Sequence, residues 1–346
     1  MQNDIKKPTT TIQEIAEKLN ISASTVSRAL NNNPRISEKT KTLVFQTAIA
    51  MGYQQGLVFS ETEQKNLKIL AIVLPDFENS MYNEAVKAIQ IKAIANGFST
   101  MVFLSNHSPS IEFEIIRKII EMKVSGVAIS LSYKTQNDEM VKQLINSGIP
   151  LVMFNRVFHH LSVRRVIFDN FQTGFKAVEH LASVGCKKIA FLSGHPECQI
   201  VQEREKGYRS ALSKSGLAYE SKYLLYSDLT LTDISRSIEY LYSLSSPPDA
   251  IIASNNIIAL QVISLLKNLG LNVPADVAVL GIGHDSFQAF ISPTLSSLQL
   301  PGNLIGNKVA SLLFQQINDS GEKYTAQTQI IPPKLIIRNS TMKYGY

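Results

Sequence analysis

The sequence predicts a small all-α unit at the N-terminus, followed by an α/β core that is built from two doubly wound parallel sheets. The chain has 346 residues, which is too long for one hydrophobic core. Apolar residues recur with a helical period in the first 57 positions. From residue 69 onward, short apolar runs alternate with helical segments, a pattern typical of parallel strands joined by crossover helices.

Three helices are expected in the N-terminal unit. The first has apolar residues at positions 12, 15, 16 and 19, which fall on one helical face. The second is capped by Ser22 and runs to about Asn31. The third is capped by Ser37 and stops at Gly52. Two helices joined by a turn of about four residues form a helix-turn-helix.

The core is expected to begin with a buried strand at "ILAIVLP", residues 69–75. The other strands are expected at 98–105, 125–130, 149–154, 163–168, 187–194, 223–226, 248–254, 276–282 and 294–300, before a closing strand pair that ends in "KLIIRN". The helices are expected at about 80–96, 111–122, 136–147, 171–184, 201–215, 232–244, 256–269 and 303–318. Two such sets in series predict two lobes, with a ligand site in the crevice at the carboxyl ends of the strands.

These patterns give a domain layout. Residues 1–57 form the helix-turn-helix unit, 58–68 the linker and 69–346 the two-lobed core that binds a ligand and dimerises. Lobe 1 is assigned to about 69–160 and 296–322, and lobe 2 to about 161–292 and 323–340.

Charge is concentrated at the N-terminus. Residues 1–57 hold seven Lys and Arg against four Asp and Glu, so half of the formal net charge of +6 lies in the first sixth of the chain. Concentrated positive charge on a small unit is the electrostatic pattern of a nucleic-acid reader. No apolar run is long enough to span a membrane and no secretory signal is recognisable, so we expect a cytoplasmic protein without a membrane partner. Its two cysteines fit a reducing compartment.

The second helix has the composition of a DNA-reading helix. Ser24, Ser27, Arg28 and Asn31 share the face away from Val26. Arg28 is the best candidate to read a guanine by a bidentate contact, and Ala23 and Ser24 would read neighbouring bases by packing or a single hydrogen bond. The residues expected to contact phosphates are Thr11, Ser22, Thr25, Ser27, Asn31, Ser37 and Thr40, and Arg35 could reach either bases or phosphates. The alternative is that these hydroxyl groups are helix caps on a solvated surface.

At this point the sequence resembles the lactose/galactose repressor (LacI-type) family of transcription regulators over nearly its whole length. The likeness is carried by "TIQEIAEKLNISASTVSRALNNNPRISEKTKTLVFQTAIAMGYQ", "GFKAVEHLASVGCKKIAFLSG", "EREKGYRSAL", "PDAIIASNNIIAL", "DVAVLGIGHDSF" and "ISPTLSSLQLP". It implies a dimeric operator-binding protein whose core is similar to periplasmic sugar-binding proteins and holds a small effector between its lobes.

The linker departs from the family pattern. Members carry a short hinge helix whose leucine wedges into the minor groove, a device that kinks DNA. In "YQQGLVFSETEQKNLK", Phe59 stands where the family has alanine and Thr62 stands where it has leucine. Either Leu57 or Phe59 does the wedging, or this protein bends its operator little.

The resemblance also implies the effector residues. Arg204 matches the family arginine that reaches ligand hydroxyls or a carboxylate, and Asn255 matches a polar residue of the crevice. The other candidates are Asn79, Tyr82, Asn155, Phe168, Asp228 and Asp285. Because "GIGHDSF" has Gly283 where sugar-binding members have aspartate, a plain sugar is a weaker inference than usual, and a disaccharide, a sugar phosphate or a sugar acid is plausible.

The sequence thus predicts a regulator, more readily a repressor than an activator, that reads a pseudo-palindromic operator as a homodimer, with a tetramer as the alternative. A sugar-binding sensor with weak operator affinity is the second reading. An enzyme on a doubly wound fold is the third, but "GIGHDSF" has only two glycines and comes late in the chain, and no histidine has metal-ligand spacing. No cofactor and no metal are expected.

Overall fold

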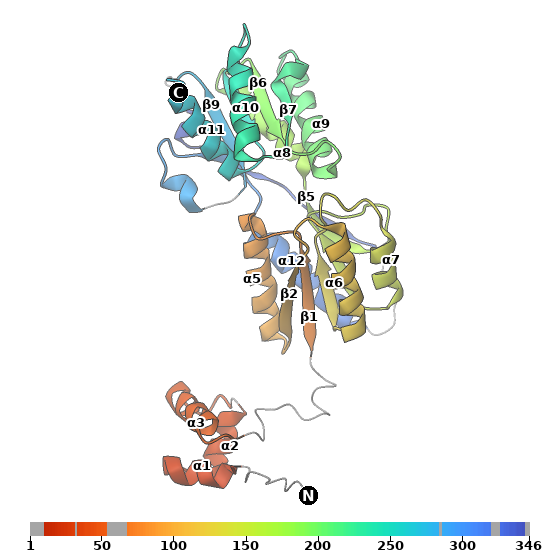
Figure 1. Cartoon of the computed structure of the whole chain (residues 1–346), viewed down its shortest axis with the longest axis vertical. Helices are drawn as coiled ribbons and strands as arrows, with labels where there is room; N and C mark the ends of the chain where they lie inside the picture. The colour runs from red at the N-terminus through yellow and green to blue at the C-terminus, as the bar shows by residue number, and fades with distance from the viewer. Residues whose placement is uncertain (1–9, 32, 54–67, 284–285, 320–325, 343–346) are drawn as a thin grey trace, which may run out of the picture. The chain divides into compact units, whose positions relative to one another are not determined.

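The computed structural model describes residues 10–31, 33–53, 68–283, 286–319 and 326–342. The chain divides into two compact units, Met1–Leu67 and Lys68–Tyr346, which are drawn in Figure 1. None of the helices in the described ranges is both long and apolar enough to cross a membrane.

The N-terminal unit contains the three helices that the periodicity predicts. They are α1 (Ile12–Leu19), α2 (Ala23–Leu30) and α3 (Glu38–Ala50). Their common core consists of Ile15, Ala16, Val26, Ala29, Val44, Ala48 and Tyr53, all of them buried. The helices are short, so packing of these apolar faces stabilises them more than intrinsic helix propensity does.

The first sheet of the core has six parallel strands in the order β11-β5-β4-β3-β1-β2. The strands are β1 (Ile69–Leu74), β2 (Ser99–Leu104), β3 (Gly126–Ile129), β4 (Leu151–Phe154), β5 (Arg164–Phe168) and β11 (Thr328–Ile331). The helices of this lobe are α5 (Ser80–Ala95), α6 (Pro109–Met122), α7 (Glu139–Asn146) and α12 (Gly302–Asn318).

The second sheet has the order β12-β10-β9-β8-β6-β7, in which only β12 runs antiparallel to its neighbour. The strands are β6 (Ile189–Ser193), β7 (Leu224–Tyr226), β8 (Ala250–Ala253), β9 (Ala278–Ile282), β10 (Ser296–Gln299) and β12 (Lys334–Ile336). The helices are α8 (Asn170–Ser183), α9 (Gln199–Lys214), α10 (Leu231–Ser243) and α11 (Asn256–Asn268). Short 3-10 turns lie at Ser221–Tyr223, Ser286–Ala289 and Asn339–Thr341.

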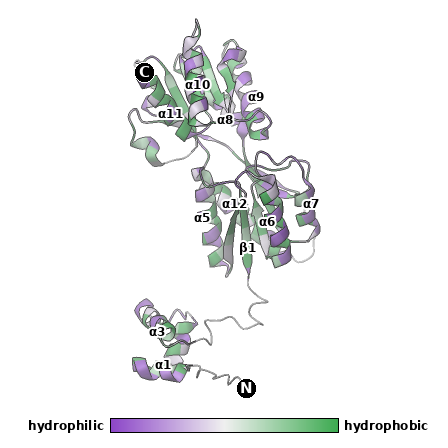
Figure 2. Cartoon of the chain, viewed as in Figure 1, coloured by the Kyte–Doolittle hydropathy of each residue, from purple (hydrophilic) through white to green (hydrophobic). Residues whose placement is uncertain are grey.

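The apolar runs of the sequence become the interior of both sheets. Strands such as β1 and β9 are buried along almost their whole length, which is typical of parallel strands covered on both faces. Figure 2 shows the same contrast, with green strands at the centre and helices that are partly purple. The expected fold, a helix-turn-helix unit and two doubly wound sheets, is therefore confirmed.

The assignment of strands to lobes was wrong in three places. Residues 164–168 and 328–331 belong to the first sheet rather than to lobe 2, and 296–299 belong to the second sheet rather than to lobe 1. These strands lie where the chain passes from one sheet to the other, after β5, after β10 and between β11 and β12. An apolar run of four or five residues does not indicate which sheet it will join.

The expected closing strand pair is also corrected. The strands β11 and β12 exist, but β11 pairs with β5 and β12 pairs with β10, so they do not pair with each other. Pro332 and Pro333 separate them. Proline fixes φ and lacks a backbone N–H, which is incompatible with the two-residue turns that close a tight hairpin.

Candidate functional site

The helix α2 presents a polar face to solvent. Ser24, Arg28 and Asn31 are exposed, while Val26 and Ala29 on the other side are fully buried. Ala23, Thr25 and Ser27 are half-buried beside that exposed face. A helix with small polar residues and one long cationic side chain on its exposed face has the shape and charge for a close approach to a polyanion.

Several of the hydroxyl groups expected at phosphates act as helix caps. Ser22 Oγ accepts a hydrogen bond from Thr25 N at 3.1 Å, and Ser37 Oγ accepts one from Thr40 N at 3.2 Å. Thr11 forms a capping box with Glu14 at the start of α1. The expected caps at Ser22 and Ser37 are therefore confirmed. Capping uses one lone pair of each hydroxyl oxygen. The other backbone N–H groups at these helix N-termini remain a favourable site for a phosphate group.

Two arginines of the N-terminal unit, Arg28 and Arg35, have exposed side chains. Within the described ranges, neither Arg28 nor Arg35 forms an ion pair with a carboxylate. The contacts of these residues with bases or phosphates stay predictions. The hinge candidates Leu57, Phe59 and Thr62 lie outside the described residues, as does Asp285.

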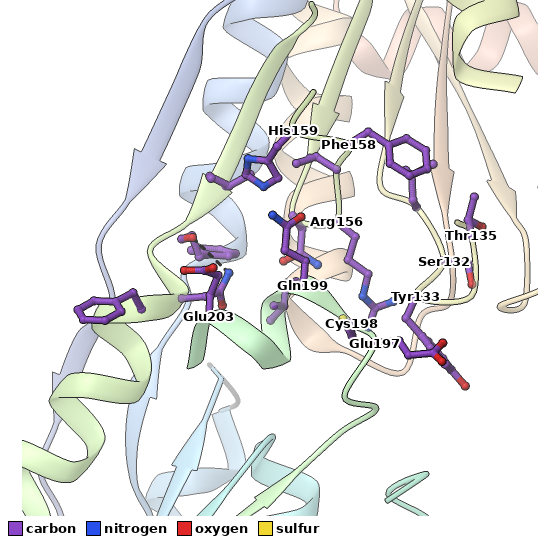
Figure 3. A pocket seen from close by; sticks show the side chains of 18 of the residues that line it. Ser132, Tyr133, Thr135, Arg156, Phe158, His159, Glu197, Cys198, Gln199 and Glu203 are labelled. Atoms are coloured by element: carbon purple, nitrogen blue, oxygen red, sulfur yellow. Dashed lines mark hydrogen bonds between the residues drawn. The ribbon is translucent and has the colours of Figure 1, made fainter. Parts of the chain in front are cut away.

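The core contains a pocket of about 590 Å³ where the two lobes meet at the carboxyl ends of their strands. Figure 3 shows its side chains from close by. Its wall is formed by residues of the first lobe up to β5, by the start of α8, by the start of α9 and by one residue of β11. They are Leu131, Ser132, Tyr133, Thr135, Gln136, Asn155, Arg156, Val157, Phe158, His159, Ile167, Phe168, Asp169, Asn170, Phe171, Glu197, Cys198, Gln199, Ile200, Glu203 and Ile330.

Two of the predicted effector residues line this pocket, and two stand directly behind it. Asn155 and Phe168 belong to the wall. Tyr82 is buried behind Asn155, whose Nδ2 donates a hydrogen bond to the Tyr82 hydroxyl at 2.9 Å. Arg204 lies behind Asn170, with its Nε donating to Asn170 Oδ1 at 3.1 Å. The structure thus joins two candidates, Tyr82 and Asn155, that are 73 residues apart in sequence.

The other described candidates have local partners and are not part of the wall. Asn79 caps α5 by accepting from Met81 N, and Asn255 caps α11 by accepting from Ile258 N. Asp228 is largely exposed and pairs with His195 at 2.6 Å. A ligand role for these three residues would require them to exchange these partners.

Glycine contacts between α8 and α9 place Arg204. A Cβ atom at Gly207 would lie 2.0 Å from the Phe171 carbonyl oxygen, and one at Gly174 would lie 1.9 Å from the Arg204 carbonyl oxygen. Only glycine allows such a close approach of two helices. The crossing holds the first turns of α9 against the start of α8, next to the pocket. Burial, together with the like charge of Arg156, lowers the pKa of Arg204 to about 10.

Arg156 is a pocket residue that the sequence reasoning missed. It is the second residue after β4, next to Asn155, and extends toward Cys198 and Tyr133 in Figure 3. Its guanidinium lies over the Tyr133 ring at 5.9 Å from the centroid. A polar residue just after a parallel strand indicates a ligand site. This position could have identified Arg156 as well as Asn155.

The pocket loop at residues 131–136 is held by a buried carboxyl group, which was also missed. Glu112 on α6 has no exposed surface. It accepts hydrogen bonds from Ser132 N at 2.9 Å and from Thr135 Oγ1 at 2.6 Å. Burial raises the pKa of this carboxyl group, and the hydrogen bonds from Thr135 and Ser132 offset only part of that rise.

The mouth of the pocket is bridged by side chains from both lobes. Tyr133 stacks on His195, with ring centroids 4.8 Å apart and an interplanar angle of 18°. Gln136 Nε2 donates to Glu197 Oε2 at 3.0 Å across the same gap. Nothing in the spacing of these residues along the chain indicates either contact.

In the part of the chain that the structure describes, no group of three or more His, Cys, Asp or Glu side chains could hold a metal ion. The pocket has a few convergent polar groups on an apolar and aromatic wall, an arrangement typical of small-molecule sites.

Comparison with known proteins follows the same division of the chain. A family model described as "Bacterial regulatory proteins, lacI family" matches residues 11–55, and one described as "Periplasmic binding protein-like domain" matches residues 178–341. The HTH-type transcriptional repressor CytR of Escherichia coli (strain K12) is 27% identical over 331 residues, which cover 96% of this chain and 96% of CytR.

Two solved structures share the fold over almost the whole chain. The transcriptional regulator CelR in complex with cellobiose is 24% identical, covers 96% of this chain and 99% of its own, and has a TM-score of 0.71. The Lac repressor dimer bound to operator and the anti-inducer ONPF is 20% identical, covers 97% and 100%, and has a TM-score of 0.73. The chain belongs to the lacI family of bacterial transcription regulators, with the DNA-binding helices of that family ahead of a periplasmic-binding-protein-like core.

Proposed function

We propose that this protein is a repressor that binds a pseudo-palindromic operator as a homodimer and changes its operator affinity when a small effector occupies the pocket of the core. The observation that carries the proposal is the exposed face of α2, where Arg28 is free of carboxylate partners in the described ranges and stands among small polar side chains. Operator binding by a relative supports the proposal, since the Lac repressor dimer was solved on its operator.

In the proposed complex, α2 lies in the major groove. Arg28 reads a guanine, Ala23 and Ser24 pack on neighbouring bases, and Arg35 reaches a base or a phosphate from the loop. Contacts to phosphates come from Thr11, Ser22, Thr25, Ser27, Asn31, Ser37 and Thr40. Leu57, Phe59 and Thr62 stay the hinge candidates.

The proposed effector is a sugar, a sugar phosphate or a sugar acid. A pocket of about 590 Å³ lies within the usual range of ligand sites, about 300–1,000 Å³. Asn155 and Phe168 would contact the effector and Arg204 would reach it from behind Asn170. CelR, a relative in fold, was solved with cellobiose. Binding shifts operator affinity only if the effector prefers one arrangement of the lobes, and the coupling is then reciprocal.

The proposed dimer uses apolar surface of the core. Ile91 and Ile94 on α5 are 60% and 66% exposed, and Met101 on the edge strand β2 is 36% exposed. Ile257 and Phe290 add exposed apolar surface on the other lobe, at 47% and 86%. Contiguous exposed apolar side chains are typical of interaction surfaces, and Ile91, Ile94 and Met101 lie on elements that pack together, α5 and β2.

We propose a dimer as the minimal assembly, acting on DNA in the cytoplasm, and assign the pocket to binding rather than to catalysis.

The test uses DNA selected from a random library by the full-length chain, because the operator is not identified. Full-length protein is expected to enrich a sequence with two similar half-sites and to bind it more tightly than scrambled DNA by about 10³-fold or more. A chain that lacks residues 1–57 is expected to lose this binding. Unchanged affinity after the deletion would overturn the proposal. A selected sequence that binds only slightly more tightly than scrambled DNA would favour the alternative function, a sensor with weak operator affinity.

A further inference from the structure

The wall of the pocket contains a cationic side chain, Arg156, that forms no ion pair with the residues that the structure describes. The Nε and Nη1 atoms of Arg156 are buried and have no hydrogen-bond partner among the described residues. No carboxylate in the described ranges lies within ion-pair distance of its guanidinium. An unpaired buried charge is costly to a folded protein, so its presence in a pocket wall points to a ligand that supplies the opposite charge.

Arg204 brings a second positive charge from the other lobe, directly behind the Asn170 side chain of the pocket wall. Its Nε donates to Asn170 Oδ1 at 3.1 Å and its Nη1 to the Ser254 carbonyl oxygen at 3.3 Å. Both acceptors are neutral, so they satisfy donors without cancelling the charge. The lowered pKa of Arg204, to about 10, reflects its burial and the like charge of Arg156.

The N-terminus of α9 adds backbone donors at the same place. This helix has 16 residues, its N-cap is Cys198, and no side chain of the described residues caps it. Cys198, Gln199 and Ile200 all belong to the pocket wall. The first backbone N–H groups of a helix have no intrahelical partner and carry partial positive charge, so an uncapped helix start in a cavity favours an anion.

The three carboxylates of the pocket wall each have a partner. Glu203 Oε1 binds Lys206 Nζ at 2.7 Å, Glu197 Oε2 accepts from Gln136 at 3.0 Å, and Asp169 Oδ1 accepts from Gln172 N at 2.8 Å. Asp76 binds His107 Nε2 at 2.9 Å. Burial raises the pKa of Asp76, but the hydrogen bond from His107 and the charges of His107 and Arg156 outweigh it, so the pKa is lowered. The positive charge around Arg156 is thus only partly balanced.

We propose that the effector is an anion, and that its carboxylate or phosphate group binds to Arg156, Arg204 and the backbone N–H groups at the start of α9. This inference rests on the proposed role of the pocket as the effector site. It narrows the proposed effector from a sugar, a sugar phosphate or a sugar acid to the two charged classes. Guanidinium groups bind planar or tetrahedral oxyanions through paired N–H donors, which accounts for two arginines from opposite lobes. The anion would also draw the two lobes together.

The probes are inorganic phosphate, glucose, glucuronate and glucose 6-phosphate, each added to the full-length chain at constant ionic strength. Phosphate at about ten times its Kd is expected to raise the Tm of the core by about 2–4 °C. Glucuronate and glucose 6-phosphate distinguish a carboxylate from a phosphate, while glucose reports binding without charge. Phosphate also stabilises proteins generally by exclusion from their surface, so the comparison of variants decides.

The decisive variant is Arg156→Gln, and Arg209→Gln is its matched control. Arg209 lies on the same helix as Arg204 but is exposed and paired with Glu205. Arg156→Gln is expected to abolish the Tm rise with phosphate, because it removes the guanidinium group that would bind the anion. Arg209→Gln is expected to respond like wild type. A second variant, Arg204→Gln, is expected to reduce the response.

The proposal is overturned if wild type shows no greater Tm rise with the anions than Arg156→Gln does. It is equally overturned if glucose stabilises the wild type as well as its two charged derivatives do. Operator binding by the same preparations separates this inference from the proposed function. Operator binding that responds to a neutral sugar keeps the regulator and rejects the anion site. Loss of the phosphate response in Arg156→Gln keeps the anion site even if operator binding never responds.

Discussion

Tyr133 of the first lobe stacks on His195 of the second lobe, with their ring centroids 4.8 Å apart. Tyr133 also contacts His107, with ring centroids 4.9 Å apart and an interplanar angle of 51°, so the tyrosine has two imidazole neighbours. Both histidines are oriented by carboxylates, His107 by Asp76 at 2.9 Å and His195 by Asp228 at 2.6 Å. These side chains connect the two lobes next to the pocket, so the Tyr133–His195 contact depends on how close the lobes are to each other.

The stack predicts a measurable coupling between the two rings. In a double-mutant cycle with Tyr133→Leu and His195→Leu, the interaction is expected to contribute about 0.5–1.5 kcal/mol to the free energy of unfolding of the core. Urea unfolding of the four proteins gives this value. Tyr133→Phe keeps the ring and serves as the control that should retain the coupling. Strictly additive losses in the two single variants would show that the rings do not interact in solution.

The close crossing of α8 and α9 predicts that Gly207 cannot be replaced. In Gly207→Ala the new Cβ would meet the Phe171 carbonyl oxygen at 2.0 Å and Phe175 N at 2.8 Å, both backbone atoms that move only if the helices separate. We expect a loss of about 1–3 kcal/mol in the free energy of unfolding, even though alanine is the better helix former.

A matched control for this substitution is Gly194→Ala. A Cβ atom there would lie 3.4 Å from the nearest atom, a side-chain methyl of Val201, which is an ordinary contact. Its free energy of unfolding is expected to change by less than about 0.5 kcal/mol. Equal stability of the Gly207→Ala and Gly194→Ala proteins would refute the close crossing and its role in placing Arg204.

The exposed face of α2 predicts a base-specific effect of Arg28. Arg28→Ala is expected to cost about 1–3 kcal/mol on the selected operator and to relax specificity at one base position. Arg28→Lys keeps the charge but loses the bidentate geometry, so it should retain non-specific affinity while losing the same preference. Fluorescence anisotropy with the operator and its single-base variants measures both quantities. Equal operator affinity of Arg28→Ala and wild type would rule out base reading by this residue.

Glu112 predicts a pH dependence of core stability. Because burial raises the pKa of this carboxyl group in the folded state, the folded protein retains the proton over a range where the unfolded chain has lost it. Its contribution is therefore full below about pH 4.3, the ordinary value for glutamate, and declines as the pH rises through the raised pKa. Glu112→Gln lacks this titration.

The comparison is made by urea unfolding of wild type and Glu112→Gln at pH 5 and pH 8. We expect the free energy of unfolding of Glu112→Gln, relative to that of wild type, to be higher at pH 8 than at pH 5. A difference that is the same at both pH values would show that the carboxyl group is not strained by its burial. Any fixed cost of replacing an acceptor of Ser132 and Thr135 cancels in this comparison.

The order of helices and strands could be predicted from the sequence because it depends on local pattern. The caps at Ser22 and Ser37 followed from residue type, and the buried strands followed from unbroken apolar runs. The lobe to which β5 and β10 belong could not be predicted, since that depends on which neighbour each strand meets in space. Pro332 and Pro333 were a local signal that β11 and β12 do not pair with each other.

The pocket was harder to predict than the fold. Asn155 and Phe168 could be found because they stand at the carboxyl ends of strands, and Arg156 shares that position. Glu112 and His195 could not be found in this way, since each acts through a contact with a loop far away in the sequence. Such contacts depend on tertiary packing, which periodicity does not describe.

The most direct measurement is the Kd of the full-length protein for its selected operator, with and without a ligand that raises the Tm of the core. Regulation through the pocket predicts that a saturating ligand changes this Kd by about 5–150-fold, and that Arg156→Gln keeps the ligand-free Kd but loses the response. An operator Kd that stays the same in the presence of a ligand that demonstrably fills the pocket would contradict the proposed regulatory function.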